Sequence, residues 1–142
     1  MATTKVHHNT IFWYCNDVEP MRHFYTDLLG FKETFYKNDS QAGWLTYKSG
    51  DLQIVFVRAG VELPVIEDWG KQPSYEEGIL HNPSWVIEVP FDDFEAIIER
   101  IKADNTTARL DDNFREARPN HKSFWVRDPM GTTIEVYATS ES

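Results

Sequence analysis

The sequence has little cysteine, no long apolar run and a deficit of positive charge. Cys15 is the one cysteine among 142 residues, so an internal disulfide is excluded. No apolar run approaches the ~20 residues that a membrane-spanning helix needs, and no signal peptide opens the chain. The net charge is −9, which argues against sequence-independent nucleic-acid binding, because such binding needs clustered Lys and Arg. We therefore expect a cytoplasmic protein without a membrane or nucleic-acid partner.

The remaining composition is that of an ordinary globular protein. Hydrophobic residues make up 41% and charged residues 26% of the chain, and 142 residues are the length of one domain. The aromatic content is the most distinctive feature, with five tryptophans among the 142 residues. We expect most of these rings to lie in strands, where each lines either the core or an open face of a sheet.

The first half of the chain predicts one strand, one helix and three further strands. Residues 6–15 have the β-branched and aromatic content of a strand. Asp17 is a typical N-cap, apolar residues then recur at helical spacing, and Gly30 ends the predicted helix. Three extended runs separated by polar turns follow, at residues 31–36, 43–48 and 52–57.

The second half repeats this order after a long irregular connection, residues 58–83. A strand is predicted at 84–89, and Asp92 or Asp93 then caps a helix that ends near Asn105. Strands follow at about 107–110, 123–127 and 132–137. The chain is thus predicted to be one α+β domain of two tandem βαβββ units, about 5–57 and 84–138, joined by 58–83.

The stretch Asp128 to Tyr137 contains the most chemically suggestive residue. Pro129 and Gly131 predict a tight turn, and Ile134 and Val136 then alternate with polar residues in a strand. Glu135 points to the polar side, which places a carboxylate in the middle of a strand. One interpretation is a functional group facing a cavity, and the other is a solvated or ion-paired carboxylate, with Arg127 as a candidate partner.

Two segments carry a resemblance to a known family. FYTDLLGF, residues 24–31, and DPMGTTIEVY, residues 128–137, resemble the signature segments of the vicinal oxygen chelate superfamily. This superfamily includes glyoxalase I, bleomycin-resistance proteins, fosfomycin-resistance enzymes and extradiol dioxygenases. The resemblance covers nearly the whole chain and implies a cup-shaped mixed sheet that holds a ligand or a metal, commonly in a homodimer.

The metal ligands of the family are carried over only in part. The first ligand position falls on Thr10, and the corresponding position of the second unit falls on Ser84 or Trp85. A hydroxyl or an indole is a poor ligand for Zn²⁺ or Ni²⁺. Gln53 is a weak oxygen donor, and Glu135 alone matches the family pattern. His8, two residues before Thr10 on the same strand face, replaces it only if the strand contains two extra residues.

Two other residues, His121 and Cys15, are candidate reactive groups. His121 precedes a predicted strand and is interpreted as a loop residue, which serves as a general acid or base with Glu135 if the loop folds inward. Cys15 lies among apolar strand residues without nearby cations, which predicts an unreactive core thiol.

The long connection 58–83 predicts either a lid or binding loop, or a solvated linker that wraps the edge of the sheet. Its acidic residues and Trp69 suit a flat, cationic ligand through stacking and charge attraction. Together with the strand residues that face the cup, the predicted ligand-binding set is Thr10, Tyr14, Trp44, Gln53, Trp69, Ser84, Trp125 and Glu135.

Two classes of function follow from these residues and the resemblance. The first is a binding protein similar to bleomycin-resistance members, which captures a planar or cationic small molecule without a metal or other cofactor, as in antibiotic resistance. The second is a metal-dependent enzyme of the glyoxalase or dioxygenase type, in which Glu135, His8 and Gln53 hold Zn, Ni, Fe or Mn. The residues favour the first, and they leave open whether the protein is an enzyme. Acid and base catalysis by Glu135 and His121 is a third possibility without specific support.

Overall fold

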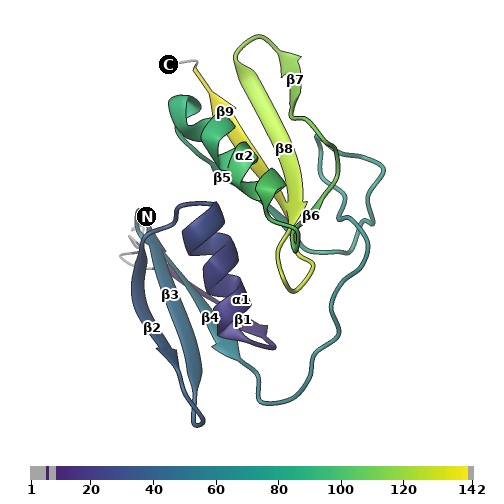
Figure 1. Ribbon diagram of the computed structural model, residues 1–142. Coiled ribbons are helices and arrows are strands. Elements are labelled where there is room, and N and C mark those ends of the chain that lie inside the picture. Colours follow the sequence, from purple (N-terminus) through teal and green to yellow (C-terminus); the bar gives the residue numbers. More distant parts are fainter. Residues whose placement is uncertain (1–5, 7–8, 141–142) are drawn as a thin grey trace, which may run out of the picture. The chain divides into compact units, whose positions relative to one another are not determined.

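The computed structural model describes Val6 and residues 9–140 of the chain (Figure 1). The chain forms two compact units, Met1–Leu63 and Pro64–Ser142. Most of the connection predicted at 58–83 therefore belongs to the second unit. Each unit is described separately below.

The first unit is a four-stranded mixed sheet with a helical segment on one face. Its elements are β1 (Asn9–Cys15), α1 (Val18–Arg22), η1 (His23–Leu28), β2 (Glu33–Asn38), β3 (Gly43–Ser49) and β4 (Leu52–Arg58). The strand order is β1-β4-β3-β2, with β1 parallel to β4 and the other pairs antiparallel. The parallel pair places the first and last strands of the unit side by side, as a βαβββ unit requires.

The first helix begins and ends where the sequence predicts, but it is not a uniform α-helix. The side chain of Asp17 accepts a 3.0 Å hydrogen bond from the backbone N–H of Glu19, which caps the helix. Gly30 has a φ of 83°, the left-handed conformation that ends many helices. Between them, the α-helix gives way to the π-helix His23–Leu28. The prediction of a single α-helical period was wrong for this second part.

The core of the first unit lies between the helix and the sheet. Tyr25 stacks on Phe56 of β4, with 4.8 Å between ring centroids, and also contacts Tyr47 of β3. The other fully buried side chains of this core include Cys15, Val18, Met21, Leu45 and Ile54. Cys15 is thus buried among apolar residues, in agreement with the sequence. The helices that the structure describes in this unit lie on that one face, and we call the opposite face of the sheet the open face.

The second unit repeats the arrangement with one additional strand. Its elements are β5 (Ser84–Glu88), the 3₁₀-helix η2 (Phe91–Asp93), α2 (Phe94–Ala103), β6 (Ala108–Arg109), β7 (Arg115–Arg118), β8 (His121–Arg127) and β9 (Thr133–Thr139). The strand order is β5-β9-β8-β6, with β5 parallel to β9, and β7 pairs with β8. First, last, third and second strands are thus neighbours in both units, which confirms the duplication.

The helix α2 packs across the sheet of the second unit (Figure 1) through one apolar stripe. Phe94, Ile97, Ile98 and Ile101 are buried on that stripe, at the spacing of one helical face. Asp93 occupies the N-cap position but makes no side-chain capping bond, because the helix is entered through the 3₁₀ turn η2. The expected capping by an aspartate is therefore not seen here.

The strand β7 was not predicted. Its sequence Arg-Glu-Ala-Arg is charged and entirely exposed, so it shows no apolar alternation that could reveal a strand. The predicted fold class is confirmed: an α+β protein made of two βαβββ units, each with a mixed sheet. Within the described residues, no helix is long and apolar enough to cross a membrane.

Candidate functional site

The turn between β8 and β9 places Glu135 on the sheet. Asp128 closes the turn, because its carboxylate accepts backbone hydrogen bonds from Met130 and Thr132 at 2.9 and 3.1 Å. Gly131 supplies the required left-handed conformation with a φ of 88°. Strand β9 then alternates as predicted, so that Glu135 points away from α2 and lies directly opposite Trp125 of β8.

Two serine hydroxyls hold the carboxylate of Glu135. Ser74 donates to one oxygen and Ser123 to the other, each at 2.7 Å, and Glu135 is 6% exposed. Ser123 comes from the neighbouring strand β8, but Ser74 comes from the segment that precedes β5. Glu135 is therefore a buried carboxylate held by neutral donors, and the partner suggested from the sequence, Arg127, is engaged elsewhere.

The segment that carries Ser74 folds back over the face of β8 and β9 that α2 leaves uncovered. We call residues 66–79 the strap. The backbone N–H of Ile66 donates to the carbonyl of Met130 at 3.0 Å, and the N–H of Gly70 donates to the Thr133 hydroxyl at 2.7 Å. Of the two interpretations of the connection, this arrangement matches a segment that covers the sheet rather than a solvated linker.

Buried polar contacts join the strap to Trp125. The indole N–H of Trp125 donates to Gln72 Oε1 at 2.8 Å, and Gln72 Nε2 donates to the carbonyl of Trp85 at 3.2 Å. Tyr75 of the strap lies 6.3 Å from Trp125, measured between ring centroids. Trp125 is only 3% exposed as a result. The strap thus covers two members of the predicted ligand set, Trp125 and Glu135.

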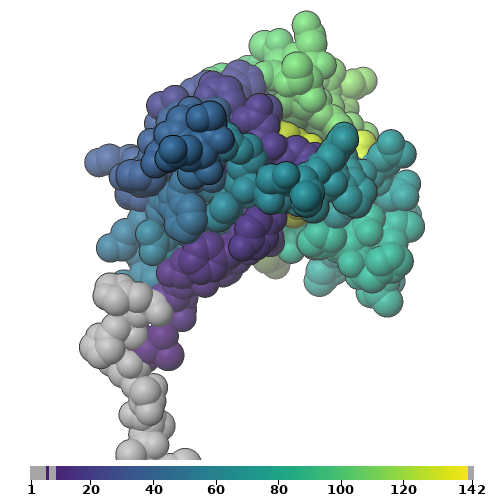
Figure 2. All heavy atoms as spheres, turned by 90° about the horizontal axis from the view of Figure 1, so that it is seen from below, coloured from purple at the N-terminus to yellow at the C-terminus, as the bar shows by residue number. Residues whose placement is uncertain are grey.

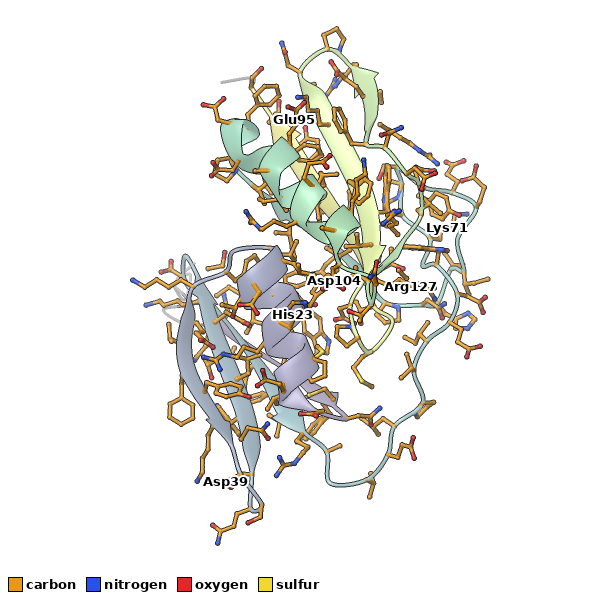
Figure 3. The ribbon with its side chains drawn as sticks, viewed as in Figure 1. His23, Asp39, Lys71, Glu95, Asp104 and Arg127 are labelled. Atoms are coloured by element: carbon orange, nitrogen blue, oxygen red, sulfur yellow. The ribbon has the colours of Figure 1, made fainter. Side chains whose placement is uncertain are left out.

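Two arginines stack on tryptophans of this unit. Arg127, labelled at the end of β8 in Figure 3, lies 4.8 Å over the ring of Trp69 in the strap. Arg115 of β7 lies 5.2 Å over the ring of Trp125. A hydrogen bond from Arg115 to Asp111 raises the pKa of the Arg115 guanidinium above its ordinary value. One face of each of these tryptophan rings, which were predicted to stack on a ligand, therefore already bears a cation of the chain itself.

The open face of the first unit is different, because its aromatic rings are exposed. The β1–β4 register pairs Thr10 with Gln53, whose side chains share a 3.2 Å hydrogen bond. Tyr14 and Trp44 flank Val57 from the two neighbouring strands. In the space-filling view, β1 (purple) lies at the surface (Figure 2). The four predicted first-unit residues therefore gather on one accessible face.

The equivalent pairing in the second unit involves neither of the residues expected from the sequence. Val86 of β5 lies opposite Glu135, as Thr10 lies opposite Gln53. Ser84 shares the face of Glu135 but is paired with Thr133, and Trp85 points to the other face because side chains alternate along a strand. The residue that corresponds to Thr10 in the duplication is thus Val86.

These positions do not fit the transition-metal site of the superfamily. A threonine, a glutamine, a valine and one glutamate supply a single strong ligand, whereas such a site needs three or four. Among the residues that the structure describes, no three His, Cys, Asp or Glu side chains are grouped to hold a metal ion. His8, the proposed replacement ligand, lies outside the described residues.

His121 is not a loop residue, as the sequence suggested, but the first residue of β8. It is buried, and its Nδ1 is hydrogen-bonded to the hydroxyl of Tyr137 on β9. Glu135 is bonded to Ser74 and Ser123 instead. The two candidates for acid and base catalysis thus have separate hydrogen-bond partners.

Sequence reasoning missed four residues that contact members of the predicted ligand set. Ser74 and Gln72 lie in an irregular segment, where no sequence pattern indicates which residues contact the sheet. Arg115 lies in the charged strand β7, which was not predicted. Phe12 could have been found, since it alternates with Thr10 and Tyr14 along β1.

The duplicated βαβββ order and the position of Glu135 define a family. A profile of the Glyoxalase/Bleomycin resistance protein/Dioxygenase superfamily matches residues 5–136, and the chain belongs to this superfamily. Its members include both metal-dependent and metal-free proteins. A search among curated proteins gives no significant match.

Solved structures with a similar fold include proteins of different activities. The antibiotic-binding protein TnmS3 from Streptomyces sp. CB03234 has a TM-score of 0.61 at 18% identity, covering 98% of this chain and 100% of its own. The fosfomycin-resistance protein FosX from Listeria monocytogenes has a TM-score of 0.60 at 13% identity, covering 98% and 96%. Lactoylglutathione lyase from Agrobacterium tumefaciens has a TM-score of 0.53 at 17% identity, covering 92% and 91%. At these identities the likeness concerns the fold.

Proposed function

We propose that this protein binds a planar small molecule of neutral or positive charge through aromatic side chains and without a metal ion. The observation that supports this most directly is the exposure of aromatic rings on the open face of the first unit. Phe12 is 55%, Tyr14 62% and Phe35 51% exposed. Exposed apolar side chains that gather on one face, rather than lying scattered, mark a binding surface.

The strand register shows that these rings form one surface. Phe12 and Phe35 both align with Thr46 and Val55, the two middle residues of the face, which are each 2% exposed. The rings of Phe12 and Trp44 meet edge to face, with 6.1 Å between centroids. A flat ligand laid on this surface would bury aromatic area on one side and displace water from it.

Charge supports a neutral or cationic ligand over an anionic one. The net charge of −9 lowers the potential around the whole protein and attracts cations. Lys37 and Lys48 lie on the same face as the aromatic rings, but Lys37 is paired with Asp39 at 3.7 Å. TnmS3, which has a similar fold, is an antibiotic-binding protein, and binding of that kind is what we propose here.

Calorimetric titration with three planar probes tests the proposal: cationic 9-aminoacridine, neutral acridone and an anionic anthraquinone sulfonate. We expect the cation and the neutral probe to bind more tightly than the anion. Phe12→Ala and Trp44→Ala should each weaken binding by about 1–3 kcal/mol, the usual size of an aromatic stacking contact. Leu80→Ala, which removes an apolar side chain that is 80% exposed outside this face, is the control. Binding that is unaffected by Phe12→Ala and Trp44→Ala would contradict the proposal.

The proposal includes a homodimer in the cytoplasm, as expected from the superfamily resemblance and the single cysteine. Light scattering coupled to size-exclusion chromatography tests the dimer, for which the mass should be twice the 16.6 kDa of one chain. A monomer mass at micromolar concentration would contradict it.

A further inference from the structure

The strap contains a lobe that is held by backbone contacts at its neck and by side-chain contacts with the sheet. At its neck, the backbone N–H of Lys71 donates to the carbonyl of Ile79 at 3.0 Å, and the N–H of Ile79 donates to the carbonyl of Trp69 at 2.7 Å. A Cβ on Gly78 would lie 2.4 Å from the carbonyl of Gly70, so the two chain segments of the neck are in direct contact. Residues 72–77 therefore form a lobe closed by backbone contacts.

Side chains join this lobe to the sheet beneath it. Ser74 donates to Glu135, and Gln72 bonds to the Trp125 indole and to the Trp85 carbonyl. The lobe also has internal hydrogen bonds, because the backbones of Gln72 and Tyr75 form two reciprocal bonds of 2.9 Å. Separation of the lobe from the sheet would break these side-chain contacts and would keep the internal bonds of the lobe and its neck.

Beneath the lobe lies a set of groups that would suit a ligand. Glu135 is a buried carboxylate with two hydroxyl donors, and Trp125 presents an indole ring directly opposite it in the ladder. The lobe supplies this pair with a hydrogen-bond donor, the Ser74 hydroxyl, with an acceptor for the Trp125 indole, Gln72 Oε1, and with one aromatic ring, that of Tyr75. A molecule that replaces the lobe must supply the donor and the ring, and water can take the place of the Gln72 acceptor.

We propose that the lobe competes with a ligand for the site formed by Trp125 and Glu135. The ligand is an aromatic cation with N–H donors, such as an arylamidine, which displaces Ser74 and Tyr75 and binds between Trp125 and Glu135. This inference rests on the proposed function, since it assigns a ligand class to the second-unit residues of the predicted ligand set.

Chemistry favours a cation as the replacement. An amidinium donates charge-assisted hydrogen bonds to a carboxylate, which are stronger than the hydroxyl bond that it replaces. It also neutralises a buried carboxylate whose hydrogen-bond donors among the described residues are the neutral hydroxyls of Ser74 and Ser123. The nearby guanidinium of Arg115 is paired with Asp111 through bonds of 2.8 and 3.3 Å, so its charge is already balanced.

Two serines provide a matched pair of variants, because both donate to Glu135 at 2.7 Å. Ser74 moves with the lobe, whereas Ser123 belongs to β8 and stays. Ser74→Ala weakens only the closed state, so it should raise benzamidine affinity on the order of tenfold, since apparent affinity scales with the population of the competent state. Ser123→Ala should not raise it. Glu135→Gln should remove the preference for benzamidine over neutral benzamide.

Lobe opening can also be measured without any ligand. The indole N–H of Trp125 is bonded to the lobe, whereas the amide of Ile66 is bonded to Met130 at the base of the strap. Hydrogen exchange followed by nuclear magnetic resonance should show the indole exchanging faster than this amide, after correction for intrinsic rates. Ser74→Ala should accelerate the indole on the order of tenfold, and Ser123→Ala should not.

The outcomes separate this inference from the proposed function. Exchange of the Trp125 indole in step with the Ile66 amide would overturn the lobe as a competitor, while leaving binding on the open face of the first unit intact. Equal benzamidine affinity in the wild type, Ser74→Ala and Ser123→Ala would do the same. Absence of benzamidine binding in all variants, with the acridine probes still bound, would overturn the ligand class alone.

Discussion

The indole N–H of Trp125 donates a 2.8 Å hydrogen bond to Gln72, which lies 53 positions earlier in the chain. Both side chains are almost fully buried, and the amide N–H of Gln72 donates a hydrogen bond to the carbonyl of Trp85. One glutamine thus satisfies a tryptophan of β8 and a backbone carbonyl of β5 together. The strap is therefore an integral part of the second unit.

This relationship predicts a large effect for Gln72→Ala. The substitution leaves the Trp125 N–H and the Trp85 carbonyl without Gln72, and an unsatisfied buried polar group costs about 1–3 kcal/mol. We expect a loss of stability of that size in urea unfolding. The double variant Gln72→Ala/Trp125→Phe should lose less stability than the sum of the losses in the two single variants, because each single substitution removes the same hydrogen bond. Strict additivity would show that this hydrogen bond is not formed.

Gly131→Ala should destabilise the second unit through a direct clash. An added Cβ would lie 2.0 Å from the carbonyl oxygen of Ile66, at a φ of 88°. Gly60→Ala is a matched control, because Gly60 has a φ of 80° but no atom within 4 Å of the added Cβ. We expect about 1–2 kcal/mol for the backbone strain in the control and about 1–3 kcal/mol more for Gly131→Ala. Equal losses in urea unfolding would contradict the close packing of the strap on the turn.

Tyr47 predicts a loss of stability in alkali. Burial raises the pKa of its phenol far above the ordinary value of 10.0, although the hydrogen bond with Thr26 opposes this. The unfolded chain therefore loses the Tyr47 proton at a lower pH than the folded chain. The stabilisation is complete below pH 10 and decreases as the pH rises above it. Urea midpoints between pH 8 and pH 11 should fall less steeply for Tyr47→Phe than for the wild type, and parallel curves would contradict this.

Metal addition tests the donor set of the candidate site. One glutamate with a threonine, a glutamine and a valine should not hold Zn²⁺, Ni²⁺, Fe²⁺ or Mn²⁺ tightly. We expect substoichiometric metal after incubation with each ion and dialysis, as measured by elemental analysis. Stoichiometric metal that is lost in both Glu135→Ala and His8→Ala would support the metal-dependent alternative and overturn the proposal of metal-free binding.

The sequence by itself determined the elements of each unit and the placement of Glu135. Local rules suffice for these features, because the alternation along β9, the helical stripe of α2 and the Asp128 turn are each encoded within about ten residues. It did not reveal the π-helical part of the first helix, where hydrogen-bond spacing rather than side-chain pattern changes. It also missed β7, because that strand buries none of its side chains.

Only the tertiary structure decided what surrounds the candidate site. The opposite position to Glu135 is Val86 rather than Ser84, because register between two parallel strands depends on their pairing and not on either sequence alone. One of the two serine partners of Glu135 is Ser74, which lies 61 positions away in a segment without periodicity. Such a hydrogen bond depends on where a distant segment packs against the sheet, and no local pattern in the sequence specifies that position.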